Sequence, residues 1–172
     1  MLKSLRILLV LGVSSIIFAA CWPVPKSGPT SQGKPIPIFV LVDPGIEKSF
    51  TDYQVKNRKQ TSAWMEKDIE KMLKKAGYAG YLISKRSEYK AAPGAYLLTV
   101  KITDYNPGAK VARMYVGYGV GAASMKVHYE LHKGQKQILA DNTGAGTGGE
   151  WQKAIRKIEV TTIDAVSAKL GE

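Results

Sequence analysis

Hydrophobic and polar positions follow a different pattern in each segment of the chain. A continuous apolar run over residues 38–42 ends at Asp43-Pro44-Gly45, which predicts a strand buried on both faces and then a turn. Residues 46–58 are polar and predict irregular structure. Residues 59–76 have helical spacing and are followed by Gly77, a natural C-terminal cap. The apolar face of this predicted helix consists of Met65, Ile69, Met72, Leu73 and Ala76.

The second half of the chain predicts further strands and a closing helix. Strands are expected over residues 78–84, 95–105, 125–132 and about 136–143, and the middle two alternate clearly between apolar and polar positions. An apolar, glycine-rich excursion occupies residues 109–124. A glycine cluster over residues 144–149 predicts a connection to the last helix, whose shared face is Trp151, Ile155, Ile158, Thr162, Val166 and Leu170.

The resulting order is β-α-β-β-β-β-α. A helix that must bury one face needs a sheet to cover, so we expect an α+β fold. Its sheet should be mixed and mostly antiparallel, with both helices packed on one face.

The first 21 residues have the pattern of an export signal. Lys3 and Arg6 precede a mostly apolar run over residues 7–18, which is shorter than the roughly 20 residues that a spanning helix needs. Phe18-Ala19-Ala20-Cys21 resembles the lipobox of bacterial lipoproteins, although Leu, Val or Ile is more usual where Phe18 stands. The resemblance implies cleavage before Cys21 and a diacylglyceryl group on its sulfur. Ordinary cleavage after Ala20, or a buried structural cysteine, are the alternatives.

A proline-rich segment follows the single cysteine. Residues 22–37 contain five of the 8 prolines and favour extended, polyproline-like conformations. We therefore expect three parts: a signal peptide over residues 1–20, a lipidated Cys21 with a proline-rich tether over residues 21–37, and a single globular α+β domain over residues 38–172.

The chain is basic, with 25 Lys and Arg against 14 Asp and Glu and a net charge of +11. An exported protein meets anionic headgroups or wall polymers more often than nucleic acid, so this charge does not predict nucleic-acid binding. The partners we expect are the membrane, through the lipid anchor, and an envelope protein complex or further copies of the chain.

No constellation in the sequence marks out an active site. His128, Glu130 and His132 would share one face of a strand, but nothing nearby supplies a fourth metal ligand, and a solvated face is the simpler interpretation. Gly144, Gly146 and Gly149 match G-x-G-x-x-G, with Asp164 about 20 residues further on.

Asp164 would have to end a second parallel strand to reach a ribose, but it falls within the last predicted helix. We also find no nucleophile beside a base. The expectation is therefore no catalytic residue, no metal and no cofactor.

A distinctive motif occupies residues 113–123, which read RMYVGYGVGAA before an alternating strand. This stretch resembles a group of bacterial lipoproteins that share an arginine, an apolar pair and G-x-G-x-G-A, and that are known only as a domain of unknown function. The resemblance extends over roughly residues 38–170 and implies no catalytic residues. The broader layout also looks like small α/β envelope domains of transport-auxiliary lipoproteins and of the Tol-system β-propeller protein.

The same motif predicts a docking surface. Glycines at alternate positions leave one bare backbone face, and the tyrosines are of a type enriched in binding patches. The predicted docking residues are Arg113, Tyr115, Gly117, Tyr118, Gly119 and Gly121. The alternative is that the glycines allow a helix to pack closely or form a bulge.

Taken together, these patterns predict a non-catalytic lipoprotein of the cell envelope. We expect it to be an accessory or assembly subunit of an envelope complex, related to transport; the alternative is a periplasmic lipoprotein that binds lipid or glycan. An acidic residue directly after the lipidated cysteine often signals retention in the inner membrane. Trp22 stands at that position instead, so we expect the outer membrane.

Overall fold

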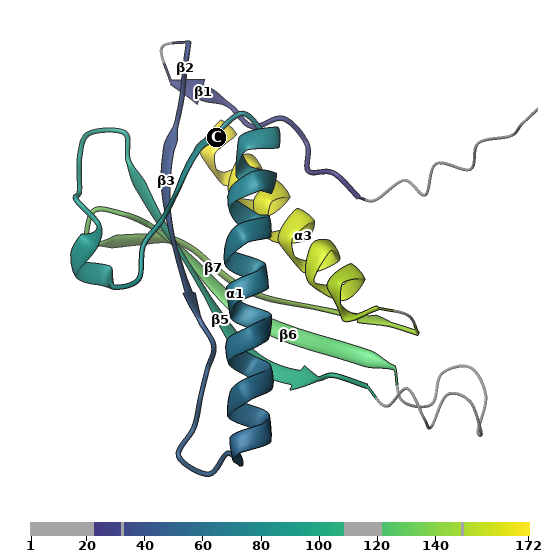
Figure 1. Cartoon of the computed structure of the whole chain (residues 1–172). Coiled ribbons are helices and arrows are strands. Elements are labelled where there is room, and N and C mark those ends of the chain that lie inside the picture. Colours follow the sequence, from purple (N-terminus) through teal and green to yellow (C-terminus); the bar gives the residue numbers. More distant parts are fainter. Residues whose placement is uncertain (1–22, 32, 109–121, 149) are drawn as a thin grey trace, which may run out of the picture.

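A five-stranded sheet with two helices on one face dominates the structure, which is a computed structural model (Figure 1). It describes residues 23–31, 33–108, 122–148 and 150–172. The sheet order is β4-β3-β5-β6-β7. These strands are β3 (Pro37–Asp43), β4 (Ala79–Leu82), β5 (Tyr96–Asn106), β6 (Ala123–Lys133) and β7 (Lys136–Thr147).

The pairing directions make the sheet mixed. Strand β3 lies between β4 and β5 and runs parallel to both, whereas β5, β6 and β7 form an antiparallel meander. The predicted α+β class and element order are confirmed, and the sheet has as many parallel as antiparallel pairings. The parallel half gathers the carboxyl ends of β3 and β5 at one end of the sheet.

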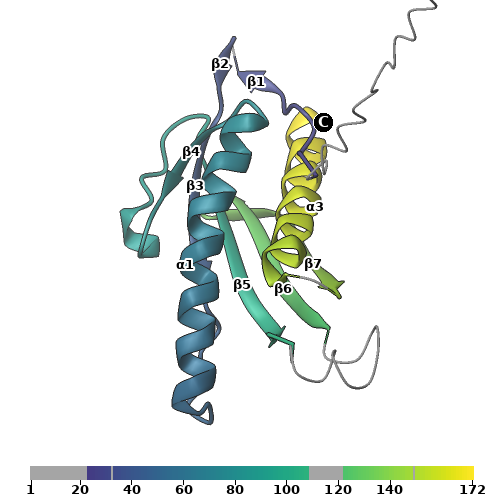
Figure 2. The same cartoon turned by 45° about the vertical axis from the view of Figure 1, so that its right-hand side comes forward.

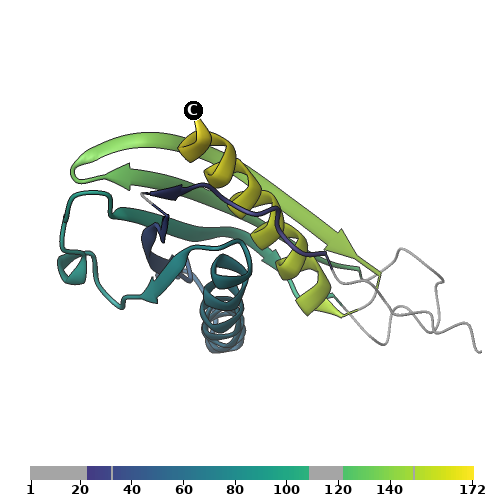
Figure 3. The ribbon, with the colours of Figure 1, turned by 90° about the horizontal axis from the view of Figure 1, so that it is seen from above.

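Both helices cover the same face of the sheet, as Figure 2 and the view from above in Figure 3 show. Helix α1 (Asp52–Lys75) packs on β3 and β4, and α3 (Trp151–Gly171) packs on β6, β7 and α1. Among the described residues, neither helix combines the length and apolar character needed to cross a bilayer.

The core lies between the helices and this face of the sheet. All five residues predicted for the apolar face of the first helix are buried. On α3, Ile155, Ile158, Thr162 and Val166 are buried, whereas Trp151 and Leu170 are only half-buried. The spacing of apolar residues therefore predicts which side of each helix meets the sheet.

Two element boundaries and the burial of one strand differ from the sequence expectation. Helix α1 begins at Asp52, well before residue 59, because Thr51 caps a polar first turn. Strand β7 runs through Gly144 and Gly146 to Thr147, since their backbones still pair with β6. In β3, Phe39 lies on the face away from the helices and is half-buried, so this strand is not buried on both faces.

The described part of the proline-rich segment lies on the domain. Residues 30–35 form a small hairpin of β1 (Thr30–Ser31) and β2 (Lys34–Pro35), and Pro25 and Ile36 are buried. The Gly28 N–H donates to the Ala76 carbonyl at the end of α1, with an N···O distance of 2.7 Å. The segment therefore contacts the domain at Pro25, Gly28 and Ile36, while Thr30, Lys34 and Pro35 of the hairpin are exposed, so it does not stand free along its whole length as the predicted tether would; the predicted signal peptide and Cys21 lie outside the described residues.

Candidate functional site

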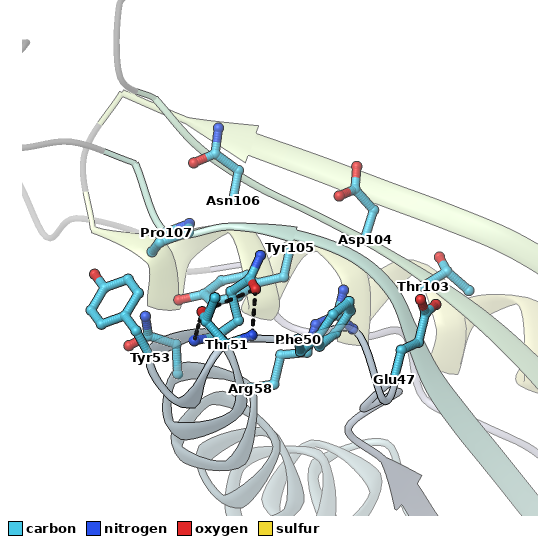
Figure 4. A pocket seen from close by; sticks show the side chains of 12 residues that line it. Glu47, Phe50, Thr51, Tyr53, Arg58, Thr103, Asp104, Tyr105, Asn106 and Pro107 are labelled. Atoms are coloured by element: carbon cyan, nitrogen blue, oxygen red, sulfur yellow. Dashed lines mark hydrogen bonds between the residues drawn. The ribbon is translucent and has the colours of Figure 1, made fainter.

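A pocket of about 690 Å³ opens at the carboxyl ends of the parallel strands β3 and β5 (Figure 4). In mixed and parallel sheets this end is where loops and helix N-termini converge and ligands commonly bind. One side of the pocket is the β3–α1 connection and the first two turns of α1, and the other side is the last part of β5.

The β5 side owes its form to a β-bulge. The register with β6 shifts between Ile102 and Asp104, so Thr103 and Asp104 are both exposed although they are neighbours. A regular strand would have turned one of them to the opposite face. After the bulge, Tyr105 returns to the helix side of the sheet and is half-buried, and all three residues line the pocket.

The helix side depends on a capping box at the start of α1. The Thr51 hydroxyl oxygen accepts from the Gln54 N–H at 3.3 Å, and the Gln54 side-chain oxygen accepts from the Thr51 N–H at 2.9 Å. Two backbone donors that would lack helical partners are thus satisfied within the chain. The cap allows a polar helical turn to extend along the pocket, where it presents Tyr53 and Asn57.

Arg58 holds the two sides together. Its Nη1 donates to the carbonyl oxygens of Pro44 at 3.0 Å, Gly45 at 3.3 Å and Ile102 at 2.8 Å. Its guanidinium also lies over the Phe50 ring, 4.8 Å from the centroid. Because the residue is 93% buried, with a relative exposure of 7%, it is a fixed part of the pocket wall.

The turn that Arg58 grips requires glycine. Gly45 has φ +60°, and a Cβ at this position would lie 2.0 Å from the Ile102 carbonyl oxygen. Glycine alone allows the β3–α1 connection to approach the bulge this closely. In this wall of the pocket the main chain of the β3–α1 connection therefore lies directly against the main chain of β5, and the buried guanidinium of Arg58 bonds to both.

The accessible charges of the pocket are acidic. Glu47 and Asp104 line it, and neither forms an ion pair with another described residue. Burial raises the pKa of the Tyr105 hydroxyl, a hydrogen bond with Thr61 lowers it, and the nearby Tyr53 raises it. Tyr105 is therefore a neutral hydrogen-bonding group at physiological pH.

The predicted docking residues Arg113, Tyr115, Gly117, Tyr118, Gly119 and Gly121 lie outside the described residues. Their segment joins β5 to β6, and it leaves β5 at Asn106 and Pro107, which both line the pocket. The docking prediction thus stays untested, but its attachment point coincides with the pocket.

The histidines singled out in the sequence lie on the sheet face away from the helices. The Glu130 carboxylate contacts both rings, with 2.9 Å to His132 Nε2 and 3.4 Å to His128 Nε2. These contacts lower the pKa of Glu130, and the His132 hydrogen bond is the largest cause. Across the described ranges no group of three or more His, Cys, Asp or Glu residues has the arrangement of a metal site.

A second polar cluster is buried between the helices. Asp68 on α1 accepts two hydrogen bonds from the guanidinium of Arg156 on α3. Glu159, with 1% exposure, lies 3.9 Å from Arg156 Nε, and neither of its carboxyl oxygens has a hydrogen-bond partner among the described residues. Burial, and then the Asp68 carboxylate, raise the pKa of Glu159 well above its ordinary value.

Sequence reasoning did not find the pocket because its residues are spread over a supposed loop and the end of a strand. The usable signal was Thr51 followed by Gln54, a capping-box spacing eight residues after the strand that ends at Asp43. That spacing places a helix N-terminus beside a strand end. The bulge in β5 left no comparable mark in the sequence.

Solved structures with a similar layout come from several bacteria. Protein XCC0632 of Xanthomonas campestris is 11% identical, with 86% of this chain and 94% of that chain covered and a TM-score of 0.48. The PelC dodecamer of Paraburkholderia phytofirmans is 15% identical, with coverages of 84% and 93% and a TM-score of 0.44. Lipoprotein GNA1162 of Neisseria meningitidis is 12% identical, with coverages of 78% and 99% and a TM-score of 0.31. No functional property is carried over from these structures.

A family model gives the firmer relationship. No curated protein matches the chain. The model of a domain of unknown function, DUF4410, matches residues 45–150, from the turn that Arg58 grips to the start of α3. This match covers more than half of the chain and includes both sides of the pocket. The protein therefore belongs to the DUF4410 family.

Proposed function

We propose that this protein is a lipid-anchored, non-catalytic lipoprotein of the cell envelope. It faces the periplasm, from the outer membrane in preference to the inner, and acts as an accessory or assembly subunit of a transport-related envelope complex. The export pattern and the lipobox-like Phe18-Ala19-Ala20-Cys21 support the anchor. Several acyl chains on one cysteine would give durable attachment without a spanning helix.

The observation that carries the assembly role is the open edge of the sheet at β7. This strand has 12 residues, and the sheet order ends with it, so no described strand lies beyond its outer edge. Long open edges are templates for pairing with another chain, and strand addition is a common mode of protein recognition. β7 contains no proline, and its exposed middle residues Ala140 and Asn142 are uncharged, with Asp141 between them as the single charge there.

The alternative function is a periplasmic lipoprotein that binds lipid or glycan, and its lipid half finds less support. An acyl chain needs an apolar cavity, whereas the pocket beside α1 is lined by carboxylates, amides and tyrosines. The DUF4410 match and the open edge are compatible with an adaptor that brings envelope components together.

The proposed lipid anchor is tested by determining the N-terminal residue of the mature protein and its modification. We expect intact mass spectrometry of membrane-extracted protein to show a chain that begins at an acylated Cys21. Cys21→Ser should leave the protein unprocessed or release it from the membrane fraction. An unmodified mature chain that starts elsewhere would contradict the lipoprotein assignment.

The assembly role is tested by affinity purification of the lipidated protein from solubilised membranes. We expect a stoichiometric partner, either another envelope protein identified by mass spectrometry or further copies of the chain detected by mass photometry. Ala140→Lys places a charge on the open edge and should abolish this association. Ala168→Lys makes the same change on the exposed side of α3 and should preserve it.

The melting temperatures of both variants should stay close to that of the wild type, since both positions are exposed. Purification of the wild-type protein as a monomer without any partner would contradict the assembly role. So would an association that Ala140→Lys leaves intact.

A further inference from the structure

The pocket beside α1 is lined by no residue of β7, and its chemistry points to a ligand of its own. We infer that it binds a neutral saccharide, as one or two sugar units of an envelope glycan. This inference goes beyond the proposed function, since an adaptor could work without it. It rests on the position of the pocket, its lining and its charges.

The position and construction of the pocket are those of a built site. It lies where parallel strands end beside a helix N-terminus, and a bulge turns Thr103 and Asp104 outward together. Arg58 and Gly45 fix the floor through three carbonyl contacts and one close main-chain approach. A volume of about 690 Å³ falls within the range of small-molecule sites.

The lining combines aromatic rings with hydrogen-bonding groups. Tyr53 is 68% exposed, although burial of its ring would be favourable, and Phe50 and Tyr105 add two half-buried rings. Amides and a hydroxyl lie among them, on Gln54, Asn57 and Thr103. A sugar ring has an apolar C–H face that packs on such rings and a rim of hydroxyls that suits such donors and acceptors.

The charges disfavour an anionic ligand. Glu47 and Asp104 are the accessible charges, and no described lysine lines the pocket of this otherwise basic chain. The Arg58 cation is buried and its Nη1 is occupied by carbonyl oxygens, and the start of α1 is capped by its own Thr51. A phosphate or a uronic acid would therefore meet repulsion, whereas carboxylates bind sugar hydroxyls well as acceptors.

The test uses the purified lipidated protein in a detergent without a sugar headgroup. Isothermal titration calorimetry is run with tetra-N-acetylchitotetraose and maltotetraose as neutral probes, tetragalacturonate as the anionic probe and chitosan tetramer as the cationic probe. We expect saturable binding of at least one neutral probe and none of tetragalacturonate. Failure of all neutral probes to bind at millimolar concentration would overturn the inference.

Variants then locate the binding. Tyr53→Ala removes an exposed ring and should weaken binding of the neutral probe by about tenfold or more. Tyr81→Ala, a change at another exposed tyrosine on β4, should keep the affinity within about twofold of the wild type. Equal affinities for wild type and Tyr53→Ala would show that the sugar binds elsewhere.

Neutralising one carboxylate of the pocket distinguishes a sugar-binding site from a cation-binding site. Asp104→Asn keeps an acceptor oxygen, so the affinity for a neutral sugar should change by less than about fivefold. Tight, salt-sensitive binding of the chitosan tetramer alone, lost in Asp104→Asn, would identify a cation site and overturn the inference. Because these measurements need no partner protein, their outcome is independent of the test on β7.

Discussion

Glu159 shows what a single buried carboxyl does in the joint between the helices. Asp68 accepts two hydrogen bonds from the Arg156 guanidinium, whereas neither carboxyl oxygen of Glu159 has a hydrogen-bond partner among the described residues to compensate for its lost hydration. Glu159 therefore holds a proton to higher pH in the folded chain than in the unfolded chain. Between these two pKa values the folded state binds more protons, so stability falls as pH rises above about 4.5.

Glu159→Gln copies the protonated carboxyl and should remove this loss. We expect the free energy of unfolding at pH 8 to rise by about 1–3 kcal/mol relative to the wild type, and the difference to vanish near pH 4. Urea unfolding followed by circular dichroism at both pH values measures it. Asp68→Asn is the contrasting variant, because it weakens the pair with Arg156 and should destabilise. A Gln variant as unstable as Asp68→Asn at pH 8 would show that Glu159 is needed as a charge.

At the scale of elements, the first two turns of α1 form a wall of the pocket while most of their side chains remain in water. Burial cannot hold such turns in place, so their order depends on the Thr51–Gln54 capping box and on the grip of Arg58. The same fact explains why hydrophobic spacing placed the start of the helix too late. The apolar stripe begins only where the helix meets the sheet.

Thr51→Ala should loosen this wall. We expect a loss of about 1 kcal/mol, concentrated in the start of α1, with faster amide exchange over residues 54–57. Hydrogen–deuterium exchange with mass spectrometry reports this region separately from the core. Thr51→Ser retains the hydroxyl and should keep most of the protection; unchanged exchange in Thr51→Ala would mean that the cap does not order the wall.

Sequence reasoning succeeded where burial dictates the pattern and failed where main-chain geometry does. Met65, Ile69 and Met72 could be assigned to one helix face because they must leave water together. The bulge after Ile102 and the pairing of Gly144 within β7 depend on neighbours distant in sequence. Arg58 shows this most clearly. The sequence placed it in a polar loop, but in the structure its guanidinium is buried and donates to the carbonyl oxygens of Pro44, just after β3, and Ile102 in β5.

At the scale of the whole molecule, the most informative junction is the one between the N-terminal segment and the helices. The segment runs over the ends of α1 and α3, where Gly28 bonds to Ala76 and the Lys26 N–H donates to the Asp164 carboxylate at 2.8 Å. Gly28 also lies against the Tyr78 ring so closely that a Cβ would lie 2.2 Å from it. Tyr78 in turn donates to Ser167 Oγ at 2.9 Å, so the segment and both helices share one joint.

This joint sets the height at which the domain would sit above a bilayer. Residues 22–24 alone separate Cys21 from the buried Pro25, and an extended chain covers at most about 3.6 Å per residue. With the lipid on Cys21, as proposed, Pro25 would stay within about 14 Å of its anchoring residue. The domain could then adopt only a narrow range of orientations and tilts relative to the lipid headgroups. Ligands and partners would meet the domain at a fixed distance from the membrane surface. The length of this three-residue segment would therefore itself affect function.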